Sequence, residues 1–273
     1  MSSRDTRHRL IQKLAWSGPG HVLLRGWLGL RRRIDYVALN QSLHTPTNGE
    51  VWLLGELPAA PVVFDVGFND GDFTGSLLEM RPQGRVVAFD PSRAAGAAHA
   101  SRFAADSRVR FVNAALSSRA GEAEFHDYGN MSSSLAARAD LEAGGVTSYR
   151  VPVRTLDEFA ASTGEGRIDF LKIDAEGFDL HVLEGAADLL AREQVDIFMF
   201  EYADGWISSR RFLEEACRYI AGKPYGLYRL YNGFLAPFEY ASRHERFDLG
   251  CMFVGVSRLR MAQQPLRVRE IPF

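Results

Sequence analysis

The segment at residues 62–74, VVFDVGFNDGDFT, constrains the fold of this chain more than any other part of the sequence. Four apolar residues surround Asp65 and predict a short buried strand. Gly67 and Gly71 then let the backbone turn tightly and approach a ligand with no Cβ in the way. Apolar side chains at helical spacing predict a helix over 73–80. A strand, a glycine turn and a helix in this order form the cradle in which α/β folds hold a nucleotide-like cofactor.

A second apolar strand follows at residues 86–89 and ends at Asp90. Asp90 comes nineteen residues after Gly71, where doubly wound folds place the acid that accepts hydrogen bonds from ribose hydroxyls. The two strands and the helix between them therefore predict one βαβ unit with a ribose-binding carboxylate.

The composition of the turn favours a cationic cofactor over a dinucleotide. The dinucleotide fingerprint G-x-G-x-x-G has a glycine at its middle position, whereas this turn has Asn69 there, with Asp70 and Asp72 beside it. Two carboxylates would repel a pyrophosphate but suit the sulfonium and the amino group of S-adenosylmethionine. The pattern favours a methyl donor over NAD, and an α/β turn that binds no nucleotide is the remaining alternative.

Five motifs, in this order and spacing, resemble the FkbM-type methyltransferases. They are D-V-G-x-N-x-G-x-F-T at 65–74, A-F-D-P at 88–91, N-A-A-L-S at 113–117, V-R-T-L-D at 153–157 and I-D-F-L-K-I-D-A-E-G at 168–177. The likeness covers residues 47–256, and the K-x-D-x-E-G segment is its most specific part. Two positions depart from the family pattern: Asp90 stands where Glu is usual, and Phe68 stands where a small residue is commoner and would narrow the cofactor pocket.

This resemblance implies a fold, a reaction and a set of cofactor contacts. The fold is the class I methyltransferase (Rossmann-like) three-layer α/β sandwich, with a seven-stranded, mostly parallel sheet whose last strand is antiparallel. The reaction is methyl transfer from S-adenosylmethionine, in most assigned members to an oxygen of a sugar, a glycolipid or a natural product. The expected cofactor-binding residues lie in the first three motifs: Asp65, Gly67, Asn69, Gly71, Phe73, Thr74, Asp90, Pro91, Asn113 and Ala114.

The rest of the body alternates strand and helix patterns, which is typical of a parallel sheet. Further strands are expected at 108–112, 170–173, 195–200, 225–231 and 250–256, and helices at 73–80, 92–103, 178–191 and 209–220. Residues 127–149 form a long insertion rich in Ser, Gly and Ala. Loops of this length in compact domains are usually functional or disordered, so we expect the insertion to form a wall of the active site.

The residues expected to carry the chemistry are Lys172, Asp174, Glu176 and Glu201, since ligands of open α/β sheets bind beyond the carboxyl ends of the strands. The donor is already activated, so the protein has mainly to position an oxygen nucleophile and remove its proton. Asp174 is the preferred base, and Glu176 and Glu201 are the alternatives. Lys172 would pair with Asp174 or lower the pKa of the acceptor, and an ion pair between Lys172 and Glu176 that holds the corner is equally compatible with the pattern.

A metal site has little support in the sequence. Asp174, Glu176 and Glu201 would offer oxygen ligands for Mg²⁺ only if they converged, which their spacing does not show. No two histidines lie four residues apart on a helix, and His181 is interpreted as an ordinary helix residue. We therefore assign no metal ligand.

The N-terminal region differs in charge from the body. Residues 1–33 contain eight Arg or Lys and one acid, a formal +7, which leaves −9 on the remainder of a chain with net charge −2. Apolar residues at helical spacing accompany these charges. We expect a basic helical extension at 1–46 and a catalytic domain at 47–273, with the extension lying on an anionic membrane or docking on its own domain as a lid or a dimer arm.

The remaining composition sets the expected location and partners. The two cysteines, Cys217 and Cys251, form no disulfide framework, and the apolar run at 22–30 is too short to span a membrane, so a cytoplasmic protein is expected. The acidic body argues against nucleic acid as a partner. A small-molecule hydroxyl acceptor is expected, and a homo-oligomer is compatible with the sequence. A nucleotide-dependent oxidoreductase and a non-catalytic cofactor-binding or interaction module are the rival functions.

Overall fold

The structure is a computed structural model that describes residues 13, 17, 22–30, 34, 40, 48–129, 133–138, 145–247 and 250–271. The chain divides into two units, Met1–Ser42 and Leu43–Phe273. The expected boundary at residue 46 falls within 41–47, which lies outside the described residues.

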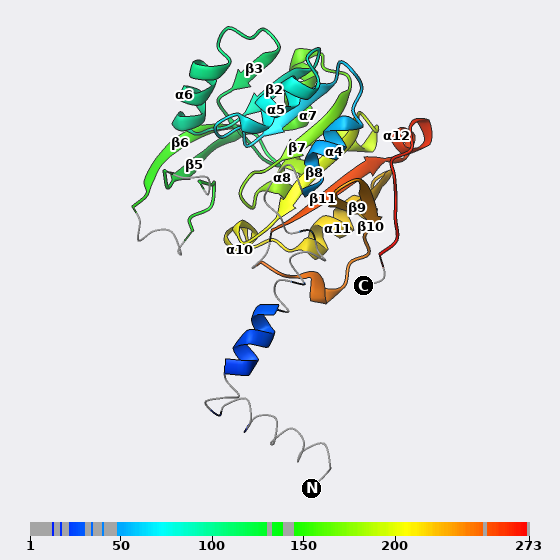
Figure 1. The fold of residues 1–273 in the computed structure, drawn as a ribbon. Coiled ribbons are helices and arrows are strands. Elements are labelled where there is room, and N and C mark those ends of the chain that lie inside the picture. The colour runs from blue at the N-terminus through cyan, green and yellow to red at the C-terminus, as the bar shows by residue number, and fades with distance from the viewer. Residues whose placement is uncertain are drawn as a thin grey trace. The chain divides into compact units, whose positions relative to one another are not determined.

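The larger unit contains an eight-stranded sheet with the order β10-β9-β11-β8-β7-β1-β2-β3 (Figure 1). Five neighbouring strands pair in parallel, and β11 runs antiparallel between β8 and β9. This confirms the mostly parallel sheet with its antiparallel last strand. The strands are β1 (Val62–Val66), β2 (Arg85–Phe89), β3 (Val109–Val112), β7 (Ile168–Ile173), β8 (Val195–Tyr202), β9 (Tyr225–Tyr231), β10 (Phe234–Pro237) and β11 (Cys251–Ser257).

The expected count of seven strands is one too few for this sheet, because β10 adds an edge strand. β10 pairs with β9 through the two-residue turn Asn232-Gly233, in which Gly233 has a φ of 87°. Asn-Gly between two apolar runs is the strongest short-range hairpin signal, so the sequence carried the information.

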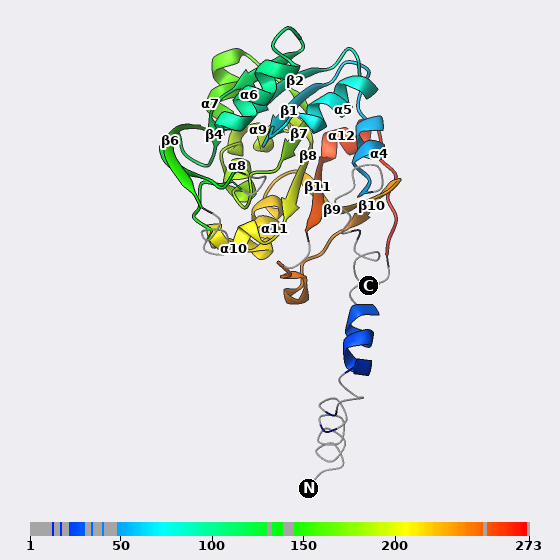
Figure 2. The same ribbon diagram turned by 60° about the vertical axis from the view of Figure 1, so that its left-hand side comes forward.

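Helices cover both faces of the sheet and make three layers (Figures 1 and 2). One apolar core joins the sheet to α7, α8, α9, α10 and α11, and a second joins the other face to α4, α5 and α6. On β1, Phe64 belongs to the first core and Val63 to the second, as the alternation of a strand requires. The helices are α4 (Glu50–Gly55), α5 (Asp72–Met80), α6 (Arg93–Arg102), α7 (Leu156–Thr163), α8 (Asp179–Glu184), α9 (Ala187–Ala191), α10 (Gly205–Ser209), α11 (Leu213–Ala221) and α12 (Arg258–Gln263), with a short 3₁₀ turn η2 (Ser242–His244).

Two of the expected helices are interrupted. The helix expected at 178–191 is divided into α8 and α9 at Gly185, where an added Cβ would lie 2.2 Å from the backbone oxygen of Ser117. The helix expected at 209–220 is α11 alone, because Arg210 adopts a left-handed conformation (φ 57°) and ends the preceding α10. Both interruptions come from the local backbone conformation, which the spacing of apolar residues does not predict.

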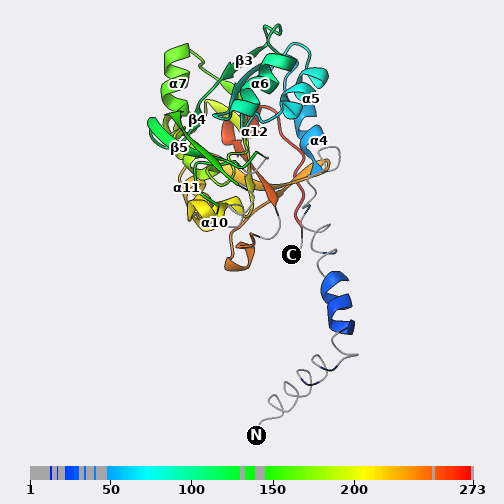
Figure 3. The same ribbon diagram turned by 90° about the vertical axis from the view of Figure 1, so that its left-hand side faces the viewer.

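A second, three-stranded sheet lies beside the first and was not expected (Figure 3). It has the order β4-β6-β5, with β4 at Ala115–Leu116, β5 at Gly121–Asp127 and β6 at Thr147–Arg154. Its own small core contains Ala115, Phe125, Val151 and Val153. The two ends of the insertion at 127–149 thus belong to β5 and β6, while its residues 130–132 and 139–144 lie outside the described residues.

In the smaller unit, residues 22–30 are helical. Most large apolar side chains of this helix, and that of Ile34, are exposed, with exposed fractions from 48% to 75% among Val22, Leu23, Trp27, Leu28, Leu30 and Ile34. Within the described residues, no helix has the length and apolar character needed to cross a membrane.

Candidate functional site

A cavity of about 370 Å³ opens beyond the carboxyl ends of β1, β2 and β7. This is the edge at which open α/β sheets bind ligands. The second sheet forms the opposite wall through Phe125 and Asp127, and the short segment 133–135 completes it. The sequence-predicted residues that line the cavity are Gly67, Asn69, Asp90, Pro91, Ala114, Asp174 and Glu176.

The packing of β1 against β7 requires a glycine at position 67. Its φ is 80°, and an added Cβ would lie 1.9 Å from the backbone oxygen of Asp174. The amide of Asp174 also donates to the carbonyl of Val66 at 3.0 Å. The end of β1 and the end of β7 therefore touch at this glycine, and any side chain would separate the two strands.

Asp90 holds the β1–α5 turn and the start of α6 with its two carboxylate oxygens. Oδ2 accepts from the amide of Asn69 at 2.9 Å, and Oδ1 accepts from the amide of Ser92 at 2.8 Å. Burial raises the pKa of Asp90, although these backbone donors oppose the shift. Each oxygen retains a lone pair for a further donor, so the carboxylate can still accept ribose hydroxyls.

Asn69 adopts a left-handed conformation with φ 51°, and Glu176 does so with φ 49° on the opposite side of the cavity. Non-glycine residues in this conformation cost about 1–3 kcal/mol and cluster at functional sites. The two turns that face the cavity therefore both carry backbone strain.

Five of the predicted cofactor contacts lie behind the cavity instead of on its wall: Asp65, Gly71, Phe73, Thr74 and Asn113. Asp65 is fully buried and accepts from the hydroxyl of Thr74 at 2.7 Å. Asn113 donates to the carbonyl of Asp90 at 2.9 Å. The side chains of Asp65, Thr74 and Asn113 thus lie next to residues that line the cavity.

Phe68 does not narrow the cavity, contrary to expectation. It is 2% exposed and packs edge-on against Phe103 and Phe111 on the side of α6. An added Cβ at Gly71 would lie 2.5 Å from this ring, so Gly71 makes room for Phe68 and not for a cofactor. The large residue is accommodated by the core between α5 and α6.

Lys172 is a buried cation surrounded by oxygen atoms. Its Nζ lies 3.4 Å from Asp65 Oδ1 and 3.4 Å from Asp174 Oδ2, and it donates to the carbonyl of Gly67 at 3.1 Å. Burial opposes its charge, but the carboxylates of Asp174, Asp65 and Glu50 outweigh burial and raise the pKa of Lys172. Lys172 thus pairs with Asp174, as one interpretation of the sequence expected, and the alternative ion pair with Glu176 is not formed.

Glu50 was missed by the sequence analysis, although α4 brings it into the same electrostatic group. It is 7% exposed, and Asn48 donates to its Oε1 at 2.6 Å. Burial raises the pKa of Glu50, whereas Lys172 lowers it. No local sequence pattern identifies Glu50 as part of this group, because its proximity to Lys172 depends on where α4 packs.

The β7–α8 turn and the end of β8 form a second group of acids. Burial, followed by the carboxylates of Asp174 and Asp179, raises the pKa of Glu176 to about 8. Burial and the carboxylate of Asp174 likewise raise the pKa of Asp179 to about 8. Burial, then Asp174, Asp179 and Glu176, raises the pKa of Glu201 to about 9. Clustered perturbed carboxyls of this kind are typical of functional sites.

The acids do not make a metal site. Among the residues that the structure describes, no three His, Cys, Asp or Glu side chains are arranged to hold one metal ion. Asp174 and Glu176 line the cavity, but Glu201 and Lys172 do not. The Mg²⁺ hypothesis therefore gains no support from the geometry.

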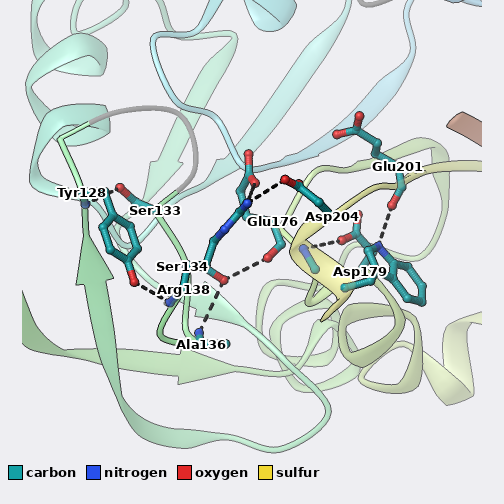
Figure 4. A network of polar contacts seen from close by, with 11 residues as sticks. Tyr128, Ser133, Ser134, Ala136, Arg138, Glu176, Asp179, Glu201 and Asp204 are labelled. Atoms are coloured by element: carbon teal, nitrogen blue, oxygen red, sulfur yellow. Dashed lines mark hydrogen bonds and ion pairs between the residues drawn. The ribbon is translucent and has the colours of Figure 1, made fainter. Parts of the chain in front are cut away.

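A polar network connects the insertion to these acids (Figure 4). Arg138 Nη2 donates to Asp204 Oδ2 at 2.7 Å, and Nη1 lies 3.8 Å from Glu176 Oε2. Ser134 Oγ donates to the backbone oxygen of Glu176 at 2.9 Å. The insertion at 127–149 was expected to form a wall of the active site, but Arg138 within it was not identified, because its partners are far away along the chain.

The strand order, the turn at the end of β1 and the carboxylate that follows β2 define a Rossmann-like fold of the class I methyltransferase type. Residues 65–223 match the Methyltransferase FkbM domain. This match spans more than half of the chain, and the chain belongs to the FkbM methyltransferase family.

Curated relatives with methyltransferase names match part of the chain. The 2-O-methyltransferase NoeI of Sinorhizobium fredii is 26% identical over 158 residues, which cover 53% of this chain and 64% of that protein. Methyltransferase sdnD of Sordaria araneosa is 26% identical over 162 residues, which cover 48% of this chain and 62% of that protein. The chain thus spans less than two thirds of the length of either relative.

Solved structures resemble the chain only distantly. A methyltransferase FkbM from Methylobacillus flagellatus is 14% identical, covers 72% of this chain and 44% of its own, and has a TM-score of 0.46. An rRNA methylase from Streptococcus thermophilus is 12% identical, covers 76% of this chain and 92% of its own, and has a TM-score of 0.40.

Proposed function

We propose that this chain is an S-adenosylmethionine-dependent O-methyltransferase that acts on a hydroxyl of a sugar-containing or other small natural-product acceptor. The observation that carries the proposal is the cavity beyond β1, β2 and β7, with Asp90 at one end and Asp174 at the other. Membership of a methyltransferase family supports the reaction type. The name of the relative NoeI, a 2-O-methyltransferase, supports oxygen as the accepting atom.

The donor-binding half of the cavity fits S-adenosylmethionine. Asp90 would accept the ribose hydroxyls with the lone pairs that Asn69 and Ser92 leave unused. Asp70 lines the same cavity and would attract the positive charge of the donor. S-adenosylmethionine supplies a methyl group that is already activated by its sulfonium, so the chain needs no further electrophile.

Asp174 is our candidate base at the acceptor hydroxyl. Its side chain lines the cavity and is 32% exposed, whereas the neighbouring Asp65 is fully buried. Lys172 lies 3.4 Å from Asp174 Oδ2 and orients this side chain through the ion pair. Glu176 is the alternative, because a pKa raised to about 8 suits a group that exchanges a proton near neutrality.

The direct test is a screen of polar metabolites with enzyme and S-adenosylmethionine, read by mass spectrometry as a gain of one methyl group. A product that also requires Asp174 supports the proposal. Calorimetric titration with S-adenosylmethionine and with NAD separates the rivals, because binding of NAD alone would revive the oxidoreductase. A chain that binds neither would be a non-catalytic module.

We further propose that the basic extension, residues 1–33, makes peripheral contact with anionic membranes. The exposed apolar side chains at 22–30, among them Trp27, and the formal charge of +7 support this. Cosedimentation of the full chain with vesicles containing anionic lipid should decrease as salt increases, since this attraction is screened beyond about 10 Å at 0.1 M salt. Equal binding to neutral vesicles would argue against charge attraction.

A further inference from the structure

Within the segment 133–138, Ser134 is hydrogen-bonded to two different sides of the cavity. On one side, the backbone groups of Ser134 exchange hydrogen bonds with those of His126 on β5, at 2.9 and 3.1 Å. On the other side, the hydroxyl of Ser134 reaches the backbone oxygen of Glu176 in the β7–α8 turn, at 2.9 Å. Ser133, Ser134 and Leu135 line the cavity. Ser134 therefore joins the second sheet to the β7–α8 turn of the main sheet.

Arg138 supplies the strongest of these attachments. Its side chain is 5% exposed, and its guanidinium is shared between Asp204 and Glu176, at 2.7 and 3.8 Å. Its own amide donates to the hydroxyl of Tyr128 at 2.6 Å, which ties the same residue back to the end of β5 (Figure 4). A planar guanidinium can hold two carboxylates at once, which an ammonium holds less well.

The positive charge of Arg138 also stabilises the ionised form of Glu176. Glu176 lies close to the carboxylates of Asp174, Asp179 and Asp204, all of which disfavour its ionised form, and Arg138 is the cation that favours it. Without the guanidinium, Asp204 and Glu176 lose the donor that joins them to segment 133–138. The β7–α8 turn and the segment 133–138 would then move apart.

We propose that Arg138 is a positioning residue of the donor site: by joining segment 133–138 to Glu176 and Asp204, it keeps the wall of the cavity closed over the bound donor. This inference rests on the proposed function, because it assigns the cavity to S-adenosylmethionine. It adds a residue outside the five motifs and gives the serine-containing segment a role in donor retention.

The experiment uses the full-length chain and four variants: Arg138→Gln, Arg138→Lys, Asp204→Asn and the double variant Arg138→Gln/Asp204→Asn. The dissociation rate of S-adenosylhomocysteine is measured by stopped flow. Arg138→Gln should dissociate about tenfold faster, as expected when a buried charge pair is broken. Asp204→Asn should be about threefold faster, because the Asp204 side chain is 57% exposed.

The remaining variants test whether Arg138 acts through its contact with Asp204. Arg138→Lys should recover part of the retention, and the double variant should be no worse than Arg138→Gln, because the two residues act through one contact. Arg150→Gln is the matched control, since Arg150 forms a long, exposed ion pair with Glu122 on the same small sheet, at 3.7 Å. It should leave the rate unchanged.

Hydrogen exchange on the ligand-free protein separates this inference from the proposed function. Arg138→Gln should speed exchange in residues 133–138 while the central strands β1 and β7 stay protected, which a general loss of stability would not produce. Unchanged exchange in this segment, or an unchanged dissociation rate in a folded Arg138→Gln protein, overturns the inference. A wild-type chain that binds no S-adenosylhomocysteine overturns the proposed function, and the exchange result still decides whether Arg138 holds the segment.

Discussion

Asp65 on β1 and Lys172 on β7 stand opposite each other in the parallel register, and their side chains form an ion pair with the Nζ–Oδ1 distance 3.4 Å. Asp65 is fully buried and the Lys172 side chain is 8% exposed. Asp174, two residues further along the strand direction, shares the same ammonium group. One buried cation therefore links the strand that begins the cofactor turn to the residue proposed as the base.

Lys172→Met should destabilise the fold, because Asp65, Asp174 and Glu50 would lose the cation that compensates them. We expect the free energy of unfolding to fall by about 3–5 kcal/mol, as when one partner of a buried pair is removed. Urea denaturation at neutral pH measures this. Arg85→Met is the control, because Arg85 forms an ion pair of the same length, 3.4 Å, with Glu165 but is 60% exposed; an equal loss there would contradict the role given to Lys172.

Gly67→Ala should lower the free energy of unfolding, independently of any effect on ligand binding. The new Cβ would meet the backbone of Asp174 at a φ of 80°, and the strain and the clash together should cost about 2–6 kcal/mol. Gly164→Ala is the control: Gly164 has a φ of 73° with nothing within 4 Å of its added Cβ. The control should lose only about 1 kcal/mol in thermal melts, and similar losses in both variants would refute the contact-based explanation.

Asp90→Ala should weaken S-adenosylmethionine binding by roughly 1.5–3 kcal/mol, the usual value of hydrogen bonds to a charged group. Part of the loss will come from the turn, since the amides of Asn69 and Ser92 lose their acceptor. Isothermal titration calorimetry gives the affinity and a thermal melt gives the cost to the fold. Asp106→Ala removes a carboxylate that also caps a loop amide but does not line the cavity, and it should leave the affinity unchanged.

Asp174→Asn should reduce kcat by roughly 10²–10⁴ while donor affinity stays within about a factor of three, as expected when a positioned base is removed. Steady-state kinetics with the acceptor from the metabolite screen measure the separation. Glu176→Gln and Glu201→Gln should have smaller effects on kcat. A larger loss in either one would transfer the role of base from Asp174 to that residue.

The acids near the cavity should make stability fall as pH rises. Burial raises the pKa of Glu176 from 4.5 to about 8, so the folded state binds its proton more tightly than the unfolded state does. Stability from this group is therefore greatest below pH 4.5 and is lost between about pH 4.5 and pH 8. Glu176→Gln should flatten the pH dependence of the urea midpoint in this window. Glu122→Gln, at an exposed position, should reproduce the wild-type slope.

Short-range sequence patterns predict the local parts of this protein. The β1–α5 turn, the strand that ends at Asp90 and the alternation of strands and helices are encoded in short apolar runs and glycine positions, whose physical effects act on neighbouring residues. The last antiparallel strand followed from the family resemblance. The hairpin that adds β10 was encoded equally locally, by Asn232-Gly233, and was missed only because that signal was not used.

Only the tertiary structure decided which of the predicted residues face the cavity and which support it. Gly67 contacts Asp174 because β1 and β7 are neighbouring strands in one register. The same register places Lys172 opposite Asp65, so Lys172 forms an ion pair with Asp65 and not with Glu176. Glu50 and Arg138 enter the site because α4 and the insertion pack against the sheet from positions far away in the chain. Burial and the field of neighbouring charges depend on these long-range contacts, and no pattern within a short window of sequence contains them.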